Sequence, residues 1–213
     1  MTEATFTTVF ARALRGHPCH VVEVDGYDEP RPLPVSDWLR PADAADHVLL
    51  DQCVGPTLDI GCGPGRLSRR LAELGHVVLG IDVVPEAVDQ TIGRGAIALR
   101  RNVFDSLPGE GRWRTALLAD GNIGIGGDPV TLLRRVRELL DPRGRVVVDV
   151  APPGVAQRTT WAVLTCGDEQ SRPFRWSVVG VDAIEGLAAG SGLSATATYC
   201  VDERWFAVLE EVL

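Results

Sequence analysis

The sequence predicts an α/β fold with a doubly wound, mostly parallel seven-stranded sheet and helices on both faces. Two patterns support this prediction. Between residues 56 and 150, short apolar segments typical of buried strands alternate with amphipathic helical segments. Near the C-terminus, residues 193–199 and 205–209 form two strand-like segments around a short turn, which predicts an antiparallel hairpin at the sheet edge.

The central region supplies most of the predicted sheet. Its helices are expected over 65–74, from Pro85 to about 92, and over 129–140, where Asp141-Pro142 should end the last one. The predicted strands alternate with these helices and span residues 58–60, 76–81, 96–100, 115–119 and 145–150.

The flanking regions are less regular. Residues 1–55 predict an N-terminal helix and hairpin-like appendage, in which Pro41 opens a second helix. Residues 151–213 predict an inserted hairpin, with strands 159–165 and 174–179 around a polar loop, then a helix over 182–189 and the edge strands. We therefore expect a single domain over 1–213, with residues 1–55 as a candidate lid and 56–150 as the ligand-binding core.

Composition excludes several classes of function. The formal net charge is -8, which disfavours nucleic acid as a partner. The sequence contains no lysine, which excludes a Schiff-base lysine and a P-loop lysine. The five cysteines are widely spaced without a CxxC pair, so a disulfide framework and a zinc site are not expected. No apolar run predicts a membrane span or signal peptide, and a cytoplasmic location is expected.

The segment from Leu58 to Arg66 predicts a nucleotide-like ligand site. A strand runs into a turn with glycine at 61, 63 and 65, and a helix follows. Glycines let backbone amides approach a ligand, and the helix N-terminus adds unpaired N–H groups. A dinucleotide site would need a small residue where Arg66 stands. Asp59 would repel a phosphate and attract an ammonium group, directly or through water.

A second acid follows the next predicted strand, in Gly80-Ile81-Asp82. A carboxylate at this position can accept hydrogen bonds from two ribose hydroxyls. A purely structural role, capping the helix that begins near Pro85, is the alternative.

The segments LDIGCGPGR and GIDVVPEAV closely resemble the class I methyltransferases that depend on S-adenosylmethionine (SAM). The match extends through roughly residues 56–150. The resemblance implies that SAM is the cofactor and S-adenosylhomocysteine (SAH) the product, that the glycine-rich turn wraps the methionine part of SAM, and that Asp82 holds the ribose. It also implies an adenine contact from residue 102, which is Asn102 here where the family places an acid, and a methionine-amine contact from the carbonyl of residue 119 or 120. The cofactor-binding residues it implies are Asp59, Gly61, Cys62, Gly63, Gly65, Asp82, Val83, Asn102, Val103, Ala119 and Asp120.

Few catalytic groups are expected, because the cofactor of such an enzyme already carries the activated methyl group. A base is needed only if the acceptor must lose a proton. Asp120 and His20 are the preferred candidates, and His17, His47 and Tyr27 are others. Trp38, Trp161 and Trp176 are candidates to line an apolar acceptor pocket, with core packing as the alternative for each.

The function predicted from the sequence is methyl transfer from SAM to a small-molecule acceptor, with no metal ion and no membrane or nucleic-acid partner. Two other functions stay open: a non-catalytic SAM-binding module, and an NAD(P)-dependent oxidoreductase on a similar fold. The identity of the acceptor, the acceptor atom and the oligomeric state do not follow from the sequence.

Overall fold

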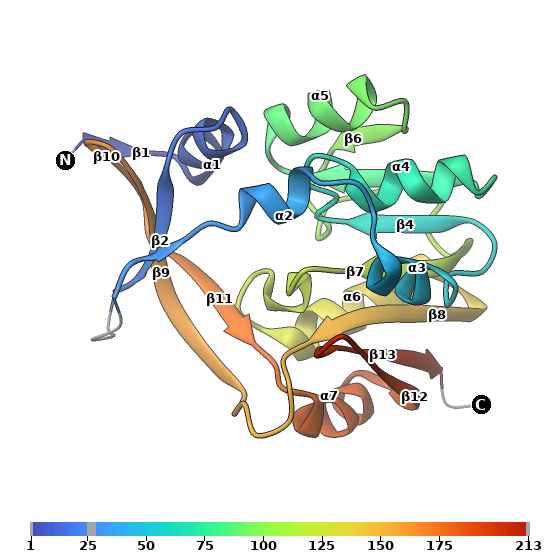
Figure 1. Cartoon of the computed structure of the whole chain (residues 1–213). Coiled ribbons are helices and arrows are strands. Elements are labelled where there is room, and N and C mark those ends of the chain that lie inside the picture. The colour runs from blue at the N-terminus through green and yellow to red at the C-terminus, as the bar shows by residue number, and fades with distance from the viewer. Residues whose placement is uncertain (1, 25–28, 212–213) are drawn as a thin grey trace.

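The computed structural model describes residues 2–24 and 29–211, which form two sheets (Figure 1). The larger sheet has seven strands in the order β12-β13-β8-β7-β4-β5-β6. Its strands are β4 (Thr57–Ile60), β5 (Val78–Asp82), β6 (Ala98–Arg100), β7 (Trp113–Leu118), β8 (Leu140–Val150), β12 (Leu193–Val201) and β13 (Arg204–Glu211).

The pairing within this sheet agrees with the predicted fold class. Strands β4 to β8 pair in parallel, whereas β13 is antiparallel to both β8 and β12. The C-terminal hairpin therefore forms one edge of the sheet, as expected. A mostly parallel sheet needs covering on both faces, because its strands are apolar on both sides.

Helices supply that cover. On one face, α6 (Pro129–Leu139) and α7 (Ile184–Ser191) bury their leucines in the main core. On the other face lie α3 (Ala44–Leu50), α4 (Arg66–Glu73) and α5 (Pro85–Gly93). Successive valines of β8 alternate between the two cores: Val146 and Val148 belong to the first and Val147 to the second. The sheet is thus doubly wound.

The second sheet joins the two flanking regions of the chain. It runs in the order β1-β10-β9-β2-β3, and β11 also pairs with β9. Helix α1 (Phe6–Leu14) packs between this sheet and α5 (Figure 1), and the short helix α2 (Val35–Leu39) follows β3. The strands are β1 (Thr2–Ala4), β2 (Cys19–Glu23), β3 (Arg31–Pro32), β9 (Arg158–Cys166), β10 (Glu169–Ser171) and β11 (Phe174–Val178).

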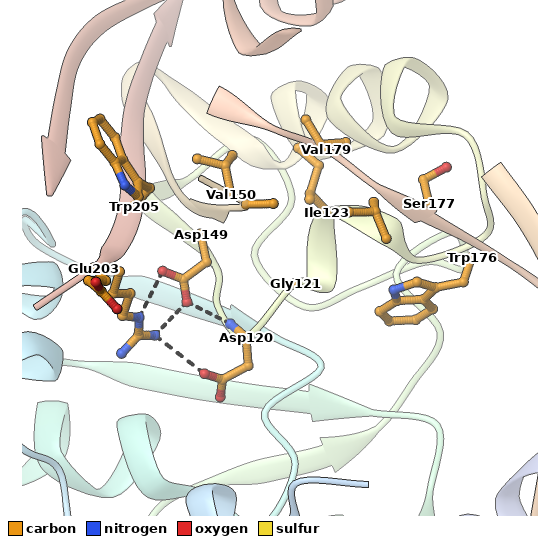
Figure 2. A pocket seen from close by; sticks show the side chains of 13 residues that line it. Asp120, Gly121, Ile123, Asp149, Val150, Trp176, Ser177, Val179, Glu203 and Trp205 are labelled. Carbon is orange, nitrogen blue, oxygen red and sulfur yellow. Dashed lines mark hydrogen bonds and ion pairs between the residues drawn. The ribbon is translucent and has the colours of Figure 1, made fainter. Parts of the chain in front are cut away.

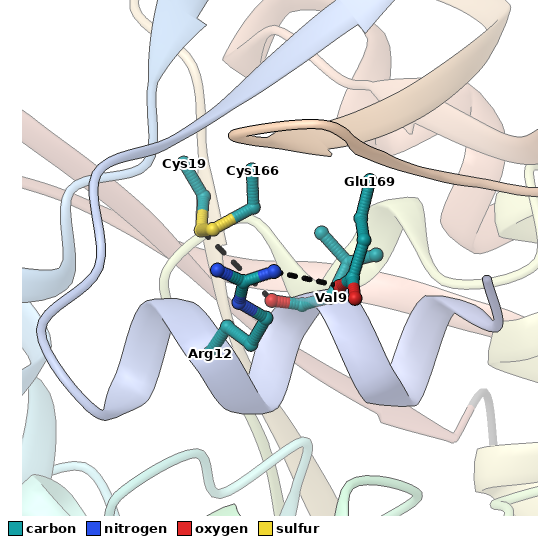
Figure 3. Close-up of a disulfide and its surroundings, with 5 residues drawn as sticks. All are labelled: Val9, Arg12, Cys19, Cys166 and Glu169. Carbon is teal, nitrogen blue, oxygen red and sulfur yellow. Dashed lines mark hydrogen bonds and ion pairs between the residues drawn. A yellow bond between two sulfur atoms is a disulfide. The ribbon is translucent and has the colours of Figure 1, made fainter. Parts of the chain in front are cut away.

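A disulfide between Cys19 and Cys166 corrects the expectation that the cysteines do not pair (Figure 3). The two residues lie directly opposite each other on β2 and β9, with Cα atoms 4.4 Å apart. They are separated by 147 residues in the sequence. The spacing of cysteines therefore carried no sign of the pair, which depends on the register of two distant strands.

Three local expectations were also wrong. The helix expected from Pro41 begins at Ala44, because Asp43 and Asp46 form a reciprocal capping box there. The helix expected to stop at Asp141-Pro142 does end there, after Leu139, but the strand expected from residue 145 already begins at Leu140. The polar loop expected after residue 165 contains β10, which pairs in parallel with β1.

Among the described residues, no helix combines the length and apolar character that crossing a membrane requires.

Candidate cofactor and acceptor site

The cofactor-binding residues predicted from the sequence gather at the carboxyl ends of β4, β5, β6 and β7. Ligands of open α/β sheets bind at this edge, where the connections that follow neighbouring strands lead to opposite faces of the sheet. The glycine-rich turn follows β4, Asp82 ends β5, and the segment from Ala119 to Ile125 follows β7.

The three glycines of the turn all have positive φ, but packing explains only two of them. A Cβ on Gly61 would lie 2.7 Å from the side-chain nitrogen of Asn122, and one on Gly65 would lie 2.8 Å from the backbone Cα of Thr91. A Cβ on Gly63 would meet no atom of residues 2–24 or 29–211 within 4 Å. The turn is therefore open at its middle glycine, where a ligand can approach the backbone.

Cys62 contributes only its backbone to this turn. Its side chain is buried with Val88 and Ala98 beneath the turn, and a Cβ on Gly80 would lie 2.8 Å from its sulfur. The glycine at 80 makes room for this thiol, and burial raises its pKa well above the usual value.

Asp59 is buried beneath the turn, with 2% of its surface exposed. Ser68 of α4 donates a hydrogen bond to Oδ2 of Asp59 at 2.6 Å. Burial raises the pKa of Asp59 to about 6, and the Ser68 hydrogen bond opposes that shift. A carboxylate in this position has no direct path to a ligand. The sequence predicted that Asp59 meets an ammonium group either directly or through water, and only the contact through water stays a prediction.

Asp82 reaches back to the glycine-rich turn. Its Oδ2 accepts the N–H of Gly63 at 3.0 Å, and its Oδ1 accepts the N–H of Val84, the residue before α5, at 2.8 Å. Asp82 therefore does help to cap the helix that begins at Pro85, which was the structural alternative for this residue. Each carboxylate oxygen keeps a second lone pair, so the side chain can also accept from ribose hydroxyls.

The segment expected to meet adenine follows β6. Asn102 is exposed, and its Oδ1 accepts the N–H of Phe104 at 3.1 Å. Val103 is buried in the main core, whereas Val83 and Phe104 are 39% and 42% exposed. Two apolar side chains thus stay open to solvent on the segments that follow β5 and β6, and Phe104 was not singled out from the sequence.

The side chain of Asp120, at the end of β7, is not free but belongs to an ion-pair network. Its backbone has φ of 52°, and its two carboxylate oxygens accept hydrogen bonds from Nη2 of Arg66 at 2.8 and 2.6 Å. Its N–H donates to Oδ2 of Asp149 at 2.7 Å. The preceding Ala119 is buried, and its carbonyl accepts the N–H of Asn122.

The same network includes the appendage and the C-terminal hairpin. The completely buried Asp46 of α3 pairs with Arg40, Arg66 and Arg204. Arg204, at the start of β13, also pairs with Asp120 and Asp149. Three guanidinium groups therefore face these three carboxylates, Arg40 also pairs with the exposed Asp43, and each buried charge has a partner. Burial alone would raise the pKa of Asp46, but the hydrogen bond from Arg66 helps to hold it well below the usual range.

A pocket of about 320 Å³ lies beside Asp120 (Figure 2). Its floor is formed by residues after β7 and at the end of β8, one wall by β11, and the other by the β12–β13 turn. The lining residues are Asp120, Gly121, Ile123, Asp149, Val150, Ala151, Trp176, Ser177, Val178, Val179, Glu203, Arg204 and Trp205.

The glycine-rich loop after β7 is shaped by β11. A Cβ on Gly124 would lie 2.6 Å from the indole nitrogen of Trp176, and one on Gly127 would lie 2.5 Å from Cβ of Arg175. An isolated bridge also pairs Ile125 with Trp176. Small residues in this loop therefore let the Trp176 indole approach the end of β7.

The predicted pocket tryptophans divide into three environments. Trp176 lines the pocket. Trp38 of α2 stacks on Phe10 of α1, with ring centroids 5.4 Å apart. Trp161 is 46% exposed, and it alternates along β9 with Ala162, whose side of the strand faces the interior. Trp38 and Trp161 therefore do not line this pocket.

The candidate histidines are likewise not among the residues that line the pocket. His20 lies on β2, opposite Thr165 of β9, and faces away from the α1 side on which its neighbour Cys19 is buried. His17 is exposed and His47 is half-buried on α3. Tyr27 lies outside the described residues. Within residues 2–24 and 29–211, no group of three or more histidine, cysteine or acidic side chains is arranged to hold a metal ion.

Sequence reasoning missed several members of the site: Asp46, Asp149, Glu203, Arg204 and Trp205. Each comes from a segment that the chain brings to this edge through long-range pairing. Asp149 and Arg204 carried a weak signal, because each interrupts or adjoins an apolar strand pattern.

Residues 57–144 match the family model described as a methyltransferase domain. These residues are therefore similar to a methyltransferase domain. The ubiquinone biosynthesis O-methyltransferase of Cereibacter sphaeroides is 33% identical over 95 residues, which cover 42% of this chain and 38% of that protein. An uncharacterized protein of Mycobacterium tuberculosis is 28% identical over 175 residues, which cover 82% of this chain and 58% of that protein. The chain thus spans less than two thirds of either relative.

Solved structures share the fold. A SAM-dependent methyltransferase from Bacteroides fragilis, in complex with SAH, has a TM-score of 0.81 at 22% identity, covering 97% of this chain and 94% of that one. The 1,6-didemethyltoxoflavin-N1-methyltransferase of Burkholderia thailandensis has a TM-score of 0.59 at 19% identity, covering 79% and 77%. The methyltransferase fold expected from the sequence is therefore confirmed.

Proposed function

We propose that this chain transfers the methyl group of SAM to a small-molecule acceptor. One observation carries the proposal. Within a methyltransferase domain, the open glycine-rich turn and Asp82 lie at the same sheet edge as a pocket of about 320 Å³. A turn suited to a cofactor and a pocket suited to an acceptor thus lie at one edge, which supports methyl transfer.

The residues present fit the cofactor. Gly63 leaves open space over the turn, and Asp82 has lone pairs for two ribose hydroxyls. Val83, Phe104 and the Asn102 side chain would receive the adenine. The backbone of the turn and the Ala119 carbonyl would receive the methionine end, with Asp59 acting through water.

SAM, when bound, supplies a methyl group on a positively charged sulfur, so the protein has mainly to align the acceptor with it. The aliphatic lining of the pocket would exclude water around the acceptor. Asp120 is proposed here as a positioning residue and not as the base, because both of its oxygens already accept from arginine. His20 is not proposed as a base, because it faces away from α1 and does not line the pocket.

Three considerations support a small acceptor. The pocket volume is at the lower end of the range for small-ligand sites. The net charge of -8 disfavours nucleic acid. The relatives named above include enzymes of ubiquinone biosynthesis and of toxoflavin methylation. We also propose a cytoplasmic location. Because the cytoplasm is reducing, a Cys19–Cys166 disulfide in the isolated protein would count against that location.

Replacing Asp82 tests the cofactor assignment. We expect Asp82→Ala to weaken SAH binding by about tenfold or more, measured by calorimetry, because two ribose hydroxyls lose their acceptor. Asp89→Ala is the matched control, since Asp89 is an exposed acid on the adjacent α5. Unchanged SAH affinity in a folded Asp82→Ala variant would refute the ribose assignment.

A further inference from the structure

The charges around the acceptor pocket are balanced except for one carboxylate. Asp120 and Asp149 line the pocket, but both pair with Arg204, and Asp120 also pairs with Arg66. Together with Asp46 and Arg40, these groups form the network of three carboxylates and three guanidiniums described above. Glu203 also lines the pocket and takes part in none of the ion pairs found among the described residues.

Glu203 is held at the pocket by a turn that favours other residues. Asp202 and Glu203 connect β12 to β13 and have φ of 48° and 66°. A two-residue hairpin with positive φ at both positions normally has Asn-Gly or a similar pair. A glutamate in the second position is therefore unfavourable for the backbone alone, although the turn places this residue in the pocket lining, directly before Arg204 and Trp205.

Two indoles line the same pocket. Trp176 comes from β11 and Trp205 from β13, and Figure 2 shows them at opposite sides of the space above Asp120. Ile123, Val150 and Val179 supply aliphatic surface between them. Indole faces attract cations, and a net negative pocket in an acidic protein attracts them further.

We infer that the acceptor is a small amine that enters the pocket as an ammonium cation, with Glu203 as the residue that selects it. This inference rests on the proposed function and names the substrate class of the same site. Phosphates and carboxylates are disfavoured as acceptors, because Arg204 is already occupied by three carboxylates.

The chemistry balances without another reactant. The bound ammonium first loses a proton to water, which leaves a neutral amine with a free electron pair. That pair forms the new nitrogen–carbon bond while the sulfur–methyl bond breaks and its electrons stay on sulfur. The products are a methylated ammonium and neutral SAH, so the single positive charge of the cofactor passes to the product.

Three probes with the same ring and different charge test this inference: phenethylammonium, 2-phenylethanol and 3-phenylpropanoate. Their affinities are measured by ligand-detected NMR on the full chain, with and without SAH. We expect phenethylammonium to bind roughly fivefold or more tightly than the alcohol, and the carboxylate to bind most weakly. Glu203→Gln should remove most of the preference for the ammonium, whereas Asp202→Asn, which removes a charge from the same turn, should leave it in place.

The outcomes separate this inference from the proposed function. Equal binding of the ammonium and the alcohol, tighter binding of the carboxylate, or an unchanged preference in Glu203→Gln would overturn the amine assignment, as would binding of none of the three. SAH affinity is measured independently. A protein that prefers the ammonium and does not bind SAH would remove methyl transfer and leave amine recognition standing.

Discussion

Arg66 and Asp120 form a two-point ion pair across the candidate site. A single guanidinium nitrogen of Arg66 donates to both carboxylate oxygens of Asp120, at 2.8 and 2.6 Å. Its other terminal nitrogen meets the buried Asp46 of α3. The first residue of α4 thereby connects the appendage to the strand end that borders the pocket. Asp120 is consequently fixed in place, and its oxygens are occupied.

Removing the Arg66 side chain should destabilise the protein strongly. Its side chain is 3% exposed, and Arg66→Ala would leave Asp46 and Asp120 with fewer partners in a site from which water is largely excluded. We expect the free energy of unfolding to fall by about 3 kcal/mol in denaturant titrations, as for other broken buried pairs.

Arg69→Ala is the matched control, because Arg69 is exposed on the same helix and, within the described part of the chain, forms an ion pair only with Glu73. It should cost less than about 0.5 kcal/mol. The double variant Arg66→Ala/Asp120→Ala should cost less than the sum of its parts. Strict additivity would show that the pair does not contribute as described.

Asp59 should make stability depend on pH. Burial raises the pKa of Asp59 to about 6 from a usual value of 3.8. A raised pKa means that the folded state holds the proton more tightly than the unfolded chain. Its stabilising contribution is therefore complete below pH 3.8 and is lost as the pH rises through 6.

Asp59→Asn tests this relation, since an amide can still accept from Ser68 but does not titrate. Between about pH 5 and about pH 7.5, we expect the wild type to lose roughly 1 kcal/mol more unfolding free energy than the variant. Ser68→Ala, which removes an opposing hydrogen bond, should move the window to higher pH. Parallel pH profiles for the wild type and Asp59→Asn would contradict the buried, protonated carboxyl.

The glycines of the turn should separate into structural and ligand-facing positions. Gly65→Ala would bring a Cβ to 2.8 Å from the backbone of Thr91 and should be the more destabilising change. Gly63→Ala meets no atom and should cost only the left-handed backbone penalty, about 1–2 kcal/mol.

The readout that distinguishes them is SAH affinity at a temperature where both variants are folded. Gly63→Ala should reduce it by about tenfold or more, because the new methyl group occupies the approach to the turn. Wild-type affinity in Gly63→Ala would indicate that the open face of the turn does not receive the cofactor.

The cysteines should titrate in three groups. Without reductant, Cys200 is the exposed free thiol and should react at once with a thiol reagent. Cys53 and Cys62 are buried, and burial raises the pKa of Cys53 to about 12, so both should react only after unfolding. The remaining two should need reduction first. Five reactive thiols in the unfolded, unreduced protein would show that Cys19 and Cys166 are not joined.

The central sheet could be predicted from the sequence because its signals are local. Strands β4 to β7 contain short apolar runs, β8 ends in one, and Pro85 and Pro129 mark the starts of α5 and α6. The glycine-rich turn and Asp82 also form a local pattern, which indicated the ligand class. The wrong helix start at Pro41 came from the same kind of local reasoning, since it overlooked the capping box of Asp43.

The second sheet and the ion-pair network could not be predicted in this way. Residues 2–4 pair with residues 169–171, and residues 19–23 pair with residues 162–166, so the register depends on the complete fold. Asp46 and Arg204 are in direct contact but 158 positions apart. The pocket lining could not be predicted for the same reason. The sequence pattern of β9 and β11 did not indicate that Trp176 faces the pocket and that Trp161 faces solvent.

The most direct test of the proposed function is a calorimetric titration of the purified protein with SAH beside a titration with NADH. We expect micromolar binding of SAH and no binding of NADH, since Arg66 occupies the position where a dinucleotide site needs a small residue. Binding of NADH without SAH would contradict the methyltransferase assignment and restore the oxidoreductase alternative.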